Sequence, residues 1–207
     1  MQATLLSIAI ALILALVTAL VGPHFVDWNK YRAEFETQAS RMTGLRVRVA
    51  GPIDARLLPT PSLNLSRIDI SRGDEAGSLR ARRLSIEFSL GSLVRGEFKA
   101  TDVILEGAEI AIALDRNGRL EWPAPSVGFD PEAISIERLD IRDSRALLAD
   151  AASGYGVVLD KFEFKGELRT LSGPVKGQGS FYADGQHYPY RIAASRVGDD
   201  RLRVRLN

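Results

Sequence analysis

The sequence predicts a mainly β protein in which an N-terminal transmembrane helix and one short amphipathic helix precede a curved antiparallel β-sheet that forms an open groove. Three observations predict this class. An uncharged apolar run opens the chain, a stripe of aromatic residues recurs at helical spacing just after it, and one eight-residue strand pattern is repeated through the remainder. With 45% hydrophobic residues and a net charge of +1, the chain is neither a disordered segment nor a general binder of polyanions such as nucleic acid.

The apolar run from Thr4 to Gly22 has the length and composition of a membrane-spanning helix. No residue between Met1 and Pro23 carries a charged side chain, and at 1.5 Å per residue the run reaches roughly 28 Å, about the thickness of the hydrocarbon core. Val17-Thr18-Ala19 resembles the cleavage site of a signal peptide, which leaves cleavage as an alternative. Because no Lys or Arg precedes the run and the run is longer than a signal core, we expect residues 1–23 to be an uncleaved anchor.

Residues 27–42 follow the anchor and predict one short amphipathic helix. This segment contains no Gly or Pro, begins at Asp27, which is a fair N-cap, and stops before Gly44. Its apolar stripe consists of Trp28, Tyr31, Phe35, Ala39 and Met42. Trp28 and Tyr31 lie where aromatic rings favour the headgroup zone of a membrane, so we predict both at the membrane interface. The alternative is that the whole stripe packs as core against the sheet that follows; both can also hold, with the first aromatics at the membrane and Phe35 and Met42 on the sheet.

An eight-residue pattern with apolar residues at positions 1, 3, 6 and 8 organises the rest of the chain. It is clearest in residues 63–70 (LNLSRIDI) and starts again at Leu79, Phe98, Ile134 and Val157. A regular strand would place positions 1 and 3 on one face and positions 6 and 8 on the other. One extra residue in the middle, a β-bulge, brings all four onto the same face and bends the strand. We therefore expect kinked strands with one shared apolar face; the alternative is a set of ordinary short strands that look alike by chance.

Further strands are predicted around these repeats by the alternation of apolar and polar residues. They cover residues 45–49, 53–58, 110–114, 155–164, 178–183, 188–194 and 201–206, and a helical turn is expected at residues 89–95. Asn117-Gly118 and Asp184-Gly185 predict chain reversals. A proline-containing linker at residues 122–125 divides the β-rich part into blocks 24–123 and 124–207. We expect the second block to continue past residue 207, because its last strand pattern runs to the final residues.

The shared apolar face is too wide for the single predicted helix to cover. About a dozen strands at about 4.8 Å each make a sheet roughly 55 Å wide, whereas a helix about 10 Å across covers two or three strands. Leaving about 600 Å² of this face in water forgoes roughly 15 kcal/mol of burial. A second sheet, a partner, more of the same chain or acyl chains must therefore close it, and a sheet folded on itself as a sandwich is the common solution among β proteins.

No set of residues predicts catalysis, a cofactor or a metal site. The chain lacks cysteine, which excludes disulfides and thiol chemistry. Its two histidines, His24 and His187, lie far apart in the sequence and in different predicted elements. Asp199-Asp200 is typical of a solvated turn, and Gly177-Gln178-Gly179 lacks the residues that complete a nucleotide-binding loop. We expect no enzyme activity and no cofactor.

Several short motifs, taken in order behind the apolar run, resemble the N-terminal region of AsmA-like proteins of Gram-negative bacteria. They are GLRVRVAG at residues 44–51, LPTPSL at 58–63, SLVRG at 92–96, Asn117-Gly118 before Trp122, and LSGP at 171–174. The likeness covers Thr4 to about Trp122 well and the second block moderately. Gly107 departs from it, because a proline is often found at this point in the family, and the family usually runs much longer than this chain.

The resemblance implies an anchor in the inner membrane, a β-rich body in the periplasm, and a long curved groove similar to that of bridge-like lipid-transfer proteins. It also implies a role in outer-membrane assembly and phospholipid delivery, with phospholipid acyl chains, the inner membrane and other envelope proteins as partners. The groove would be lined by Leu63, Leu65, Ile68, Ile70, Leu84, Ile86, Phe88, Val103, Leu105, Ile134, Ile136, Leu139 and Ile141. The alternative is a membrane-tethered periplasmic scaffold that binds another envelope protein and closes its apolar face as a β core.

Overall fold

The computed structural model describes residues 27–71, 78–97, 99–114, 120–121, 135–150, 152–168, 174–196 and 202–206, together with nine residues between positions 7 and 22. Two short helical elements come first, η1 (Trp28–Tyr31) and α2 (Arg32–Thr43). The strands are β1 (Arg46–Val49), β2 (Ile53–Arg56), β3 (Ser62–Ser71), β4 (Leu79–Phe88), β5 (Lys99–Leu114), β6 (Leu120–Glu121), β7 (Ser135–Asp150), β8 (Gly156–Leu168), β9 (Val175–Ala183), β10 (Gln186–Arg196) and β11 (Leu202–Leu206). A further helix, α3 (Leu90–Val94), joins β4 to β5.

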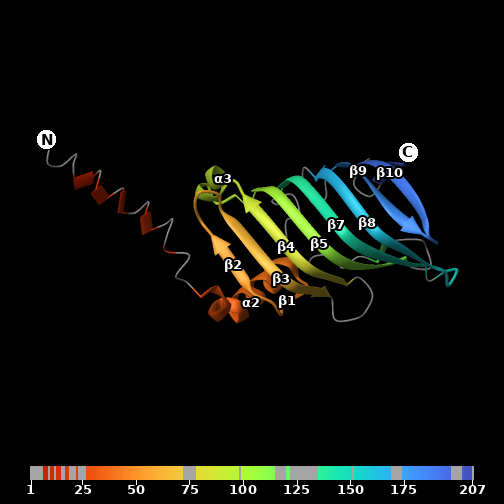
Figure 1. Cartoon of the computed structure of the whole chain (residues 1–207), viewed down its shortest axis with the longest axis horizontal. Coiled ribbons are helices and arrows are strands. Elements are labelled where there is room, and N and C mark those ends of the chain that lie inside the picture. Colours follow the sequence, from red (N-terminus) through yellow and green to blue (C-terminus); the bar gives the residue numbers. More distant parts are fainter. Residues whose placement is uncertain are drawn as a thin grey trace.

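All of the described strands belong to one open, curved sheet (Figure 1). Nine of them form its main path in the order β1-β3-β4-β5-β7-β8-β9-β10-β11, while β2 pairs with β3 and β6 pairs with β5 beside that path. Every neighbouring pair is antiparallel except β5 and β7. The prediction of a mainly β chain built on one curved, open sheet is therefore confirmed.

The predicted antiparallel pairing is wrong at one place, because β5 and β7 run parallel. The strands predicted separately at residues 98–105 and 110–114 form the single strand β5, which pairs with β7 from Lys99↔Ser135 to Leu114↔Asp150. A parallel pair needs a connection that returns to the starting end of the sheet. Apolar alternation is the same in parallel and antiparallel strands, so the repeat pattern contains no information about this pairing.

The short helices lie where the sequence predicts them. The carboxylate of Asp27 accepts a hydrogen bond from the backbone N–H of Asn29 at 3.2 Å and so caps η1, whose four residues form a 3₁₀ turn. α2 ends at Gly44, whose φ of 68° is a left-handed conformation that glycine adopts without steric penalty. α3 falls within the helical turn expected at residues 89–95 and is capped by the hydroxyl of Ser89.

Most of the predicted anchor lies outside the described residues. The nine described residues between positions 7 and 22 are helical. No helix among the described residues is both long enough and apolar enough to cross a membrane. The linker predicted at residues 122–125 also lies outside them, and the division at this point stays a prediction; strands from both predicted blocks, β5 and β7, pair within the one sheet.

A line of kinks crosses the sheet at one level, and we call it the crease. It consists of Arg67 in β3, Arg82 in β4, Gly107 in β5, Asp143 in β7 and Lys161 in β8. Four of these residues have a left-handed backbone, with φ values of 51° at Arg67, 59° at Gly107, 45° at Asp143 and 47° at Lys161. The residues paired across the sheet on either side of it are Ser66, Arg83, Glu106 and Arg142 in one row and Ile68, Ala81 and Ala108 in the next.

In β3, β4 and β8 the crease falls in the middle of the predicted repeat and keeps its apolar residues on one face, whereas in β5 and β7 it lies two residues past the repeats that start at Phe98 and Ile134. Leu65 and Ile68 flank Arg67 and are three residues apart, yet both are buried in the same core cluster. A regular strand would point them to opposite faces. The pairing of β3, β4, β5 and β7 contains no extra residue at the crease, so these strands kink together in register, and register shifts appear there only where β8 pairs with β7 and with β9.

Candidate functional site on the inner face of the sheet

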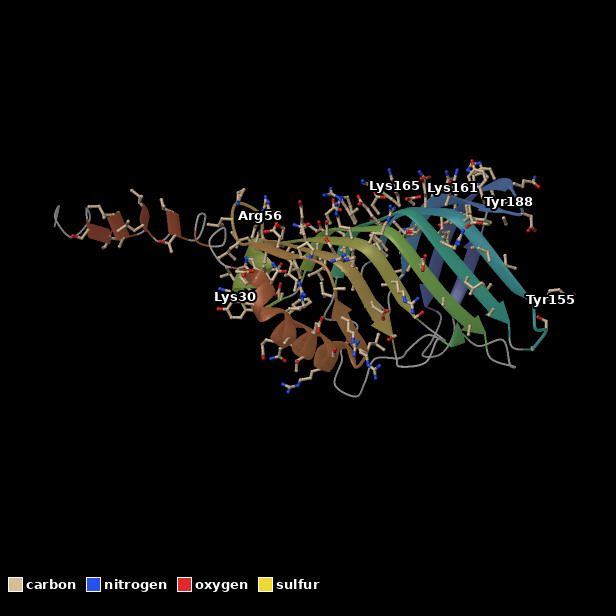
Figure 2. All side chains as sticks on the ribbon, turned by 60° about the horizontal axis from the view of Figure 1, so that its bottom comes forward. Lys30, Arg56, Tyr155, Lys161, Lys165 and Tyr188 are labelled. Carbon is tan, nitrogen blue, oxygen red and sulfur yellow. The ribbon has the colours of Figure 1, made fainter. Side chains whose placement is uncertain are left out.

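η1 and α2 pack against one side of the sheet, which we call the inner face. The rings of Trp28 and Phe35 pack against a buried cluster formed by Val49, Ile53, Leu65 and Ile68. Figure 2 shows α2 beneath the arch of strands, whereas Lys161 and Lys165 lie above it on the opposite, outer face. The alternative reading of the aromatic stripe, as core for the sheet, thus applies to Trp28 and Phe35.

Apolar side chains continue along the inner face in rows that cross the sheet. One row pairs Leu65, Leu84, Leu105, Ile141 and Phe164 through β3, β4, β5, β7 and β8. The next row pairs Leu63, Ile86, Val103 and Leu139. Beyond the crease, a third row pairs Ile70, Leu79, Ile110, Ala146 and Leu159. Because paired residues project to the same face, these rows form one continuous apolar surface.

The structure brings together the described residues that were predicted to line a groove. Leu63, Leu65, Ile68, Ile70, Leu84, Ile86, Phe88, Val103, Leu105, Ile136, Leu139 and Ile141 all lie in inner-face rows, and Ile134 lies outside the described residues. Leu65, Ile68, Val103 and Leu105 are buried, while the other eight are half-buried. Their role as lipid contacts stays a prediction.

Helical elements cover the inner face only at the β1–β3 end of the sheet, as far as the described residues extend. The second core cluster, formed by Ala81, Leu105 and Ala108, packs with side chains of β4, β5 and β7, all from the same layer. The described strands form no second sheet that could face the first. Most of the apolar surface from β4 onward is thus available to something other than the described part of the chain.

Side chains of η1 and α2 also accept hydrogen bonds from the unpaired backbone N–H groups of the edge strands β1 and β2. The backbone N–H groups of Val47 and Val49 donate to Ser40 Oγ at 2.9 Å and to Glu36 Oε1 at 2.7 Å. The N–H of Ile53 donates to Asn29 Oδ1 at 3.2 Å. Unpaired N–H groups on an edge strand attract further strands, so these side chains close the first edge of the sheet. No pattern in the sequence predicts this role for Asn29, Glu36 and Ser40.

The inner face changes from aliphatic to aromatic between β8 and β10. The ring of Phe164 lies over Gly166 and Gly177, where any added Cβ would overlap it. Further rings from the same strands stack nearby: Phe162 lies 6.0 Å from Tyr190, and Phe181 lies 5.5 Å from Tyr188, between ring centroids. The sequence analysis did not identify this aromatic end, although Phe162 and Phe164 occupy positions 6 and 8 of the repeat that starts at Val157.

Tyr190 links the strands of this aromatic end. Its hydroxyl crosses Gly179 and donates to the backbone carbonyl of Glu163 at 2.9 Å. Burial raises the pKa of Tyr190 to about 12, because the phenolate loses hydration there. Tyr190 therefore stays neutral and holds β10 against β8 across the intervening strand.

The outer face carries rows of charged residues with alternating sign. One row pairs Asp69, Arg80, Glu109 and Arg145, and Arg145 Nε donates to Asp160 at 2.6 Å. Arg82 reaches across Gly107 to form an ion pair with Asp143. Lys99 forms a charged hydrogen bond with Glu137 and lowers the pKa of that carboxyl. These pairs are solvent-exposed, so each contributes little stability, but together they keep the outer face polar.

Trp28 and Tyr31 occupy different environments. Trp28 is half-buried against the core, whereas Tyr31 is 59% exposed, and their ring centroids are 6.5 Å apart. Their placement at a membrane interface stays a prediction. Among the described residues, no group of three His, Asp or Glu side chains is arranged to hold a metal ion.

Comparison with known proteins identifies one family. The family model described as "AsmA family" matches residues 1–130, which is more than half of the chain. The matched segment contains η1, α2 and the strands β1 to β6. Neither a curated protein nor a solved structure matches the chain.

Proposed function

Because this chain belongs to the AsmA family, we propose that it is an inner-membrane-anchored periplasmic protein that shields phospholipid acyl chains on the inner face of its sheet during lipid transport to the outer membrane. In this proposal residues 4–22 form the anchor, and Trp28 and Tyr31 lie near the membrane interface. The body of the protein, from β1 onward, then projects the sheet away from the membrane.

One observation carries the proposal: two apolar rows run across the inner face from β3 to β8, and among the described residues helical elements cover only their first end. Each Å² of apolar surface that is removed from water contributes about 25 cal/mol of favourable free energy. A surface of this extent therefore favours an apolar occupant. Acyl chains fit, because they are flexible, lack hydrogen-bonding groups and can lie along rows of Leu, Ile and Val side chains.

Lipid extraction from the purified full-length chain tests this function. We expect mass spectrometry to find phospholipid in stoichiometric amounts with the wild type. Ile86→Asp combined with Phe88→Asp places two charges in the inner rows, and we expect it to remove most of that phospholipid. Ser85→Asp is the control for position, because it adds one carboxylate to the same strand between Asn64 and Ile104 on the outer face.

The controls also separate lipid binding from folding. Circular dichroism should show the same strand content in the three proteins, so that loss of lipid reports the surface and not unfolding. A wild-type chain that carries no lipid, with unfolding of the Ile86 and Phe88 variant, would contradict the proposal. That result would instead favour a tethered scaffold whose apolar face is closed as a core.

A further inference from the structure

The hairpin that joins β7 to β8 ends in a tip that is apolar on both faces, and we define this tip as Leu147, Tyr155, Val157 and Val158. Tyr155 is 79% exposed, and the other three side chains are 42–47% exposed. Leu147 pairs with Val158 on the outer face, and Leu148 pairs with Val157 on the inner face. Strands that are apolar on both faces are normally covered on both faces, yet these side chains are open to solvent.

The polar character of the outer face stops just before this tip. Among the described residues, the last charged pair along the hairpin is Arg145 with Asp160, at 2.6 Å. Beyond it, the outer-face positions of β7 and β8 hold Leu147, Ala149, Gly156 and Val158. The tip therefore differs in chemistry from the rest of the outer face, which is lined by exposed ion pairs.

On its β8 flank the tip also projects beyond the neighbouring strand β9, whereas on its β7 flank β5 pairs with β7 as far as Leu114↔Asp150. β9 reaches β8 only as far as the pair Asp160↔Tyr182, so within the described residues Gly156–Leu159 has no strand beside it on that flank. Figure 2 shows Tyr155 at the end of the sheet remote from α2 and from the N-terminal helical residues. A projecting tip of this kind can enter a surrounding medium, whereas a docking protein would cover one of its faces.

We infer that the β7–β8 tip contacts the surface of a lipid bilayer. Its four apolar side chains enter the outer part of the apolar layer, with the hydroxyl of Tyr155 at headgroup level, where tyrosine is favoured. This inference rests on the proposed function in one respect, because it takes the inner rows as the path of the acyl chains. These rows extend to Val157 and Leu159 beside the tip. An acyl chain that crosses the rim of the sheet here stays against apolar side chains throughout.

A site-specific fluorescent probe tests this contact. Because the chain has no cysteine, Ala152→Cys in the full-length protein provides a single thiol beside the tip for an environment-sensitive dye. The protein is held in lipid nanodiscs and mixed with phosphatidylethanolamine–phosphatidylglycerol vesicles that carry a doxyl-labelled quenching lipid, or with nanodiscs that carry the same lipid. We expect the dye at position 152 to be quenched in one of these arms, and the dye at Gln178→Cys, on the outer face of β9, to be unaffected.

Variants of the tip link the quenching to its apolar side chains. Val158→Asp and Leu147→Asp both lie on the outer face, and each should reduce binding to the vesicles at least about tenfold, because a carboxylate disfavours the apolar layer. Ile86→Asp, in the inner rows, should leave the quenching unchanged while it removes bound lipid. This difference distinguishes failure of the tip from failure of the proposed function.

Two results would overturn the inference. One is the absence of quenching at position 152 in both arms, and the other is full quenching in the variant that combines Val158→Asp with Leu147→Asp. Circular dichroism of each variant confirms that the hairpin still folds.

Discussion

Gly107 is the residue at which backbone conformation and side-chain packing at the crease meet. Its φ of 59° is left-handed, and a Cβ at this position would overlap the guanidinium of Arg82, which crosses it to reach Asp143. A family expectation of proline at this point would not suit this backbone, since proline fixes φ near −65°. The crease in this chain is therefore built around glycine.

Gly107→Ala should lower the free energy of unfolding by about 1–3 kcal/mol, because it combines backbone strain with displacement of Arg82. Gly154→Ala is the matched control: its φ is 72°, but no atom lies within 4 Å of an added Cβ. Urea unfolding of the full-length chain in detergent measures both. Equal losses of unfolding free energy in the two variants would mean that Arg82 has no part in the effect. When Arg82→Ala is added to Gly107→Ala, the loss should shrink to that of Gly154→Ala.

Tyr190 makes stability depend on pH at the alkaline end. Its pKa is raised to about 12 in the fold, against an ordinary value of 10.0. Deprotonation is thus easier in the unfolded chain, so its contribution is intact below pH 10 and is lost as the pH rises through about 12. We expect the thermal midpoint to fall across this range in the wild type and to fall less in Tyr190→Phe, measured by circular dichroism. Identical pH profiles would show that Tyr190 is not the group responsible.

At the scale of elements, α2 acts as a cap for a sheet edge as well as a cover for its face. Glu36 and Ser40 accept hydrogen bonds from alternate N–H groups of β1, the ones that point away from β3. Isolated edge strands bind other strands and aggregate. Side-chain acceptors on a helix remove that risk at β1 without adding a strand.

Glu36→Ala should expose the N–H of Val49 and lower stability by about 1–3 kcal/mol, since this hydrogen bond involves a charged acceptor. Glu36→Gln keeps an acceptor oxygen and serves as the control. Hydrogen exchange of the Val49 amide, followed by NMR or mass spectrometry, should accelerate in the alanine variant and change much less in the glutamine variant. Unchanged protection of the Val49 amide in Glu36→Ala would show that Glu36 of α2 does not protect the edge strand β1.

The β5–β7 pair shows which features of the elements a sequence pattern can predict. The repeat at residues 63–70 predicts the kink, the shared face and the position of Arg67, because all three are local consequences of strand geometry. The long connection between β5 and β7 decides that they pair in parallel. The residues within a strand follow the same apolar alternation in parallel and antiparallel pairs. The Arg82–Asp143 pair across Gly107 depends on that partnering, so it could not be predicted either.

At the scale of the whole molecule, the described residues that were predicted to share one apolar face do lie on one face of the sheet. The aromatic end of that face, between β8 and β10, was not predicted. Leu84, Leu105 and Ile141, at positions 6, 8 and 8 of their repeats, lie in one row across β4, β5 and β7. Phe164 and Tyr190 lie over Gly166, Gly177 and Gly179, which come from neighbouring strands. The spacing of these glycines in the sequence does not specify this packing. Both parts share one property: they present an apolar surface to the interior of the curve.

A photocrosslinker built into the inner face shows whether acyl chains occupy it. Benzoylphenylalanine at position 139 replaces Leu139 in the inner rows, and at position 138 it replaces the exposed Arg138 on the outer face. If acyl chains occupy the inner face, irradiation of the full-length protein in its native membrane should give phospholipid adducts at position 139 and none at position 138. Adducts within the protein's own chain at position 139, with no lipid, would show instead that the face is closed and would contradict the account.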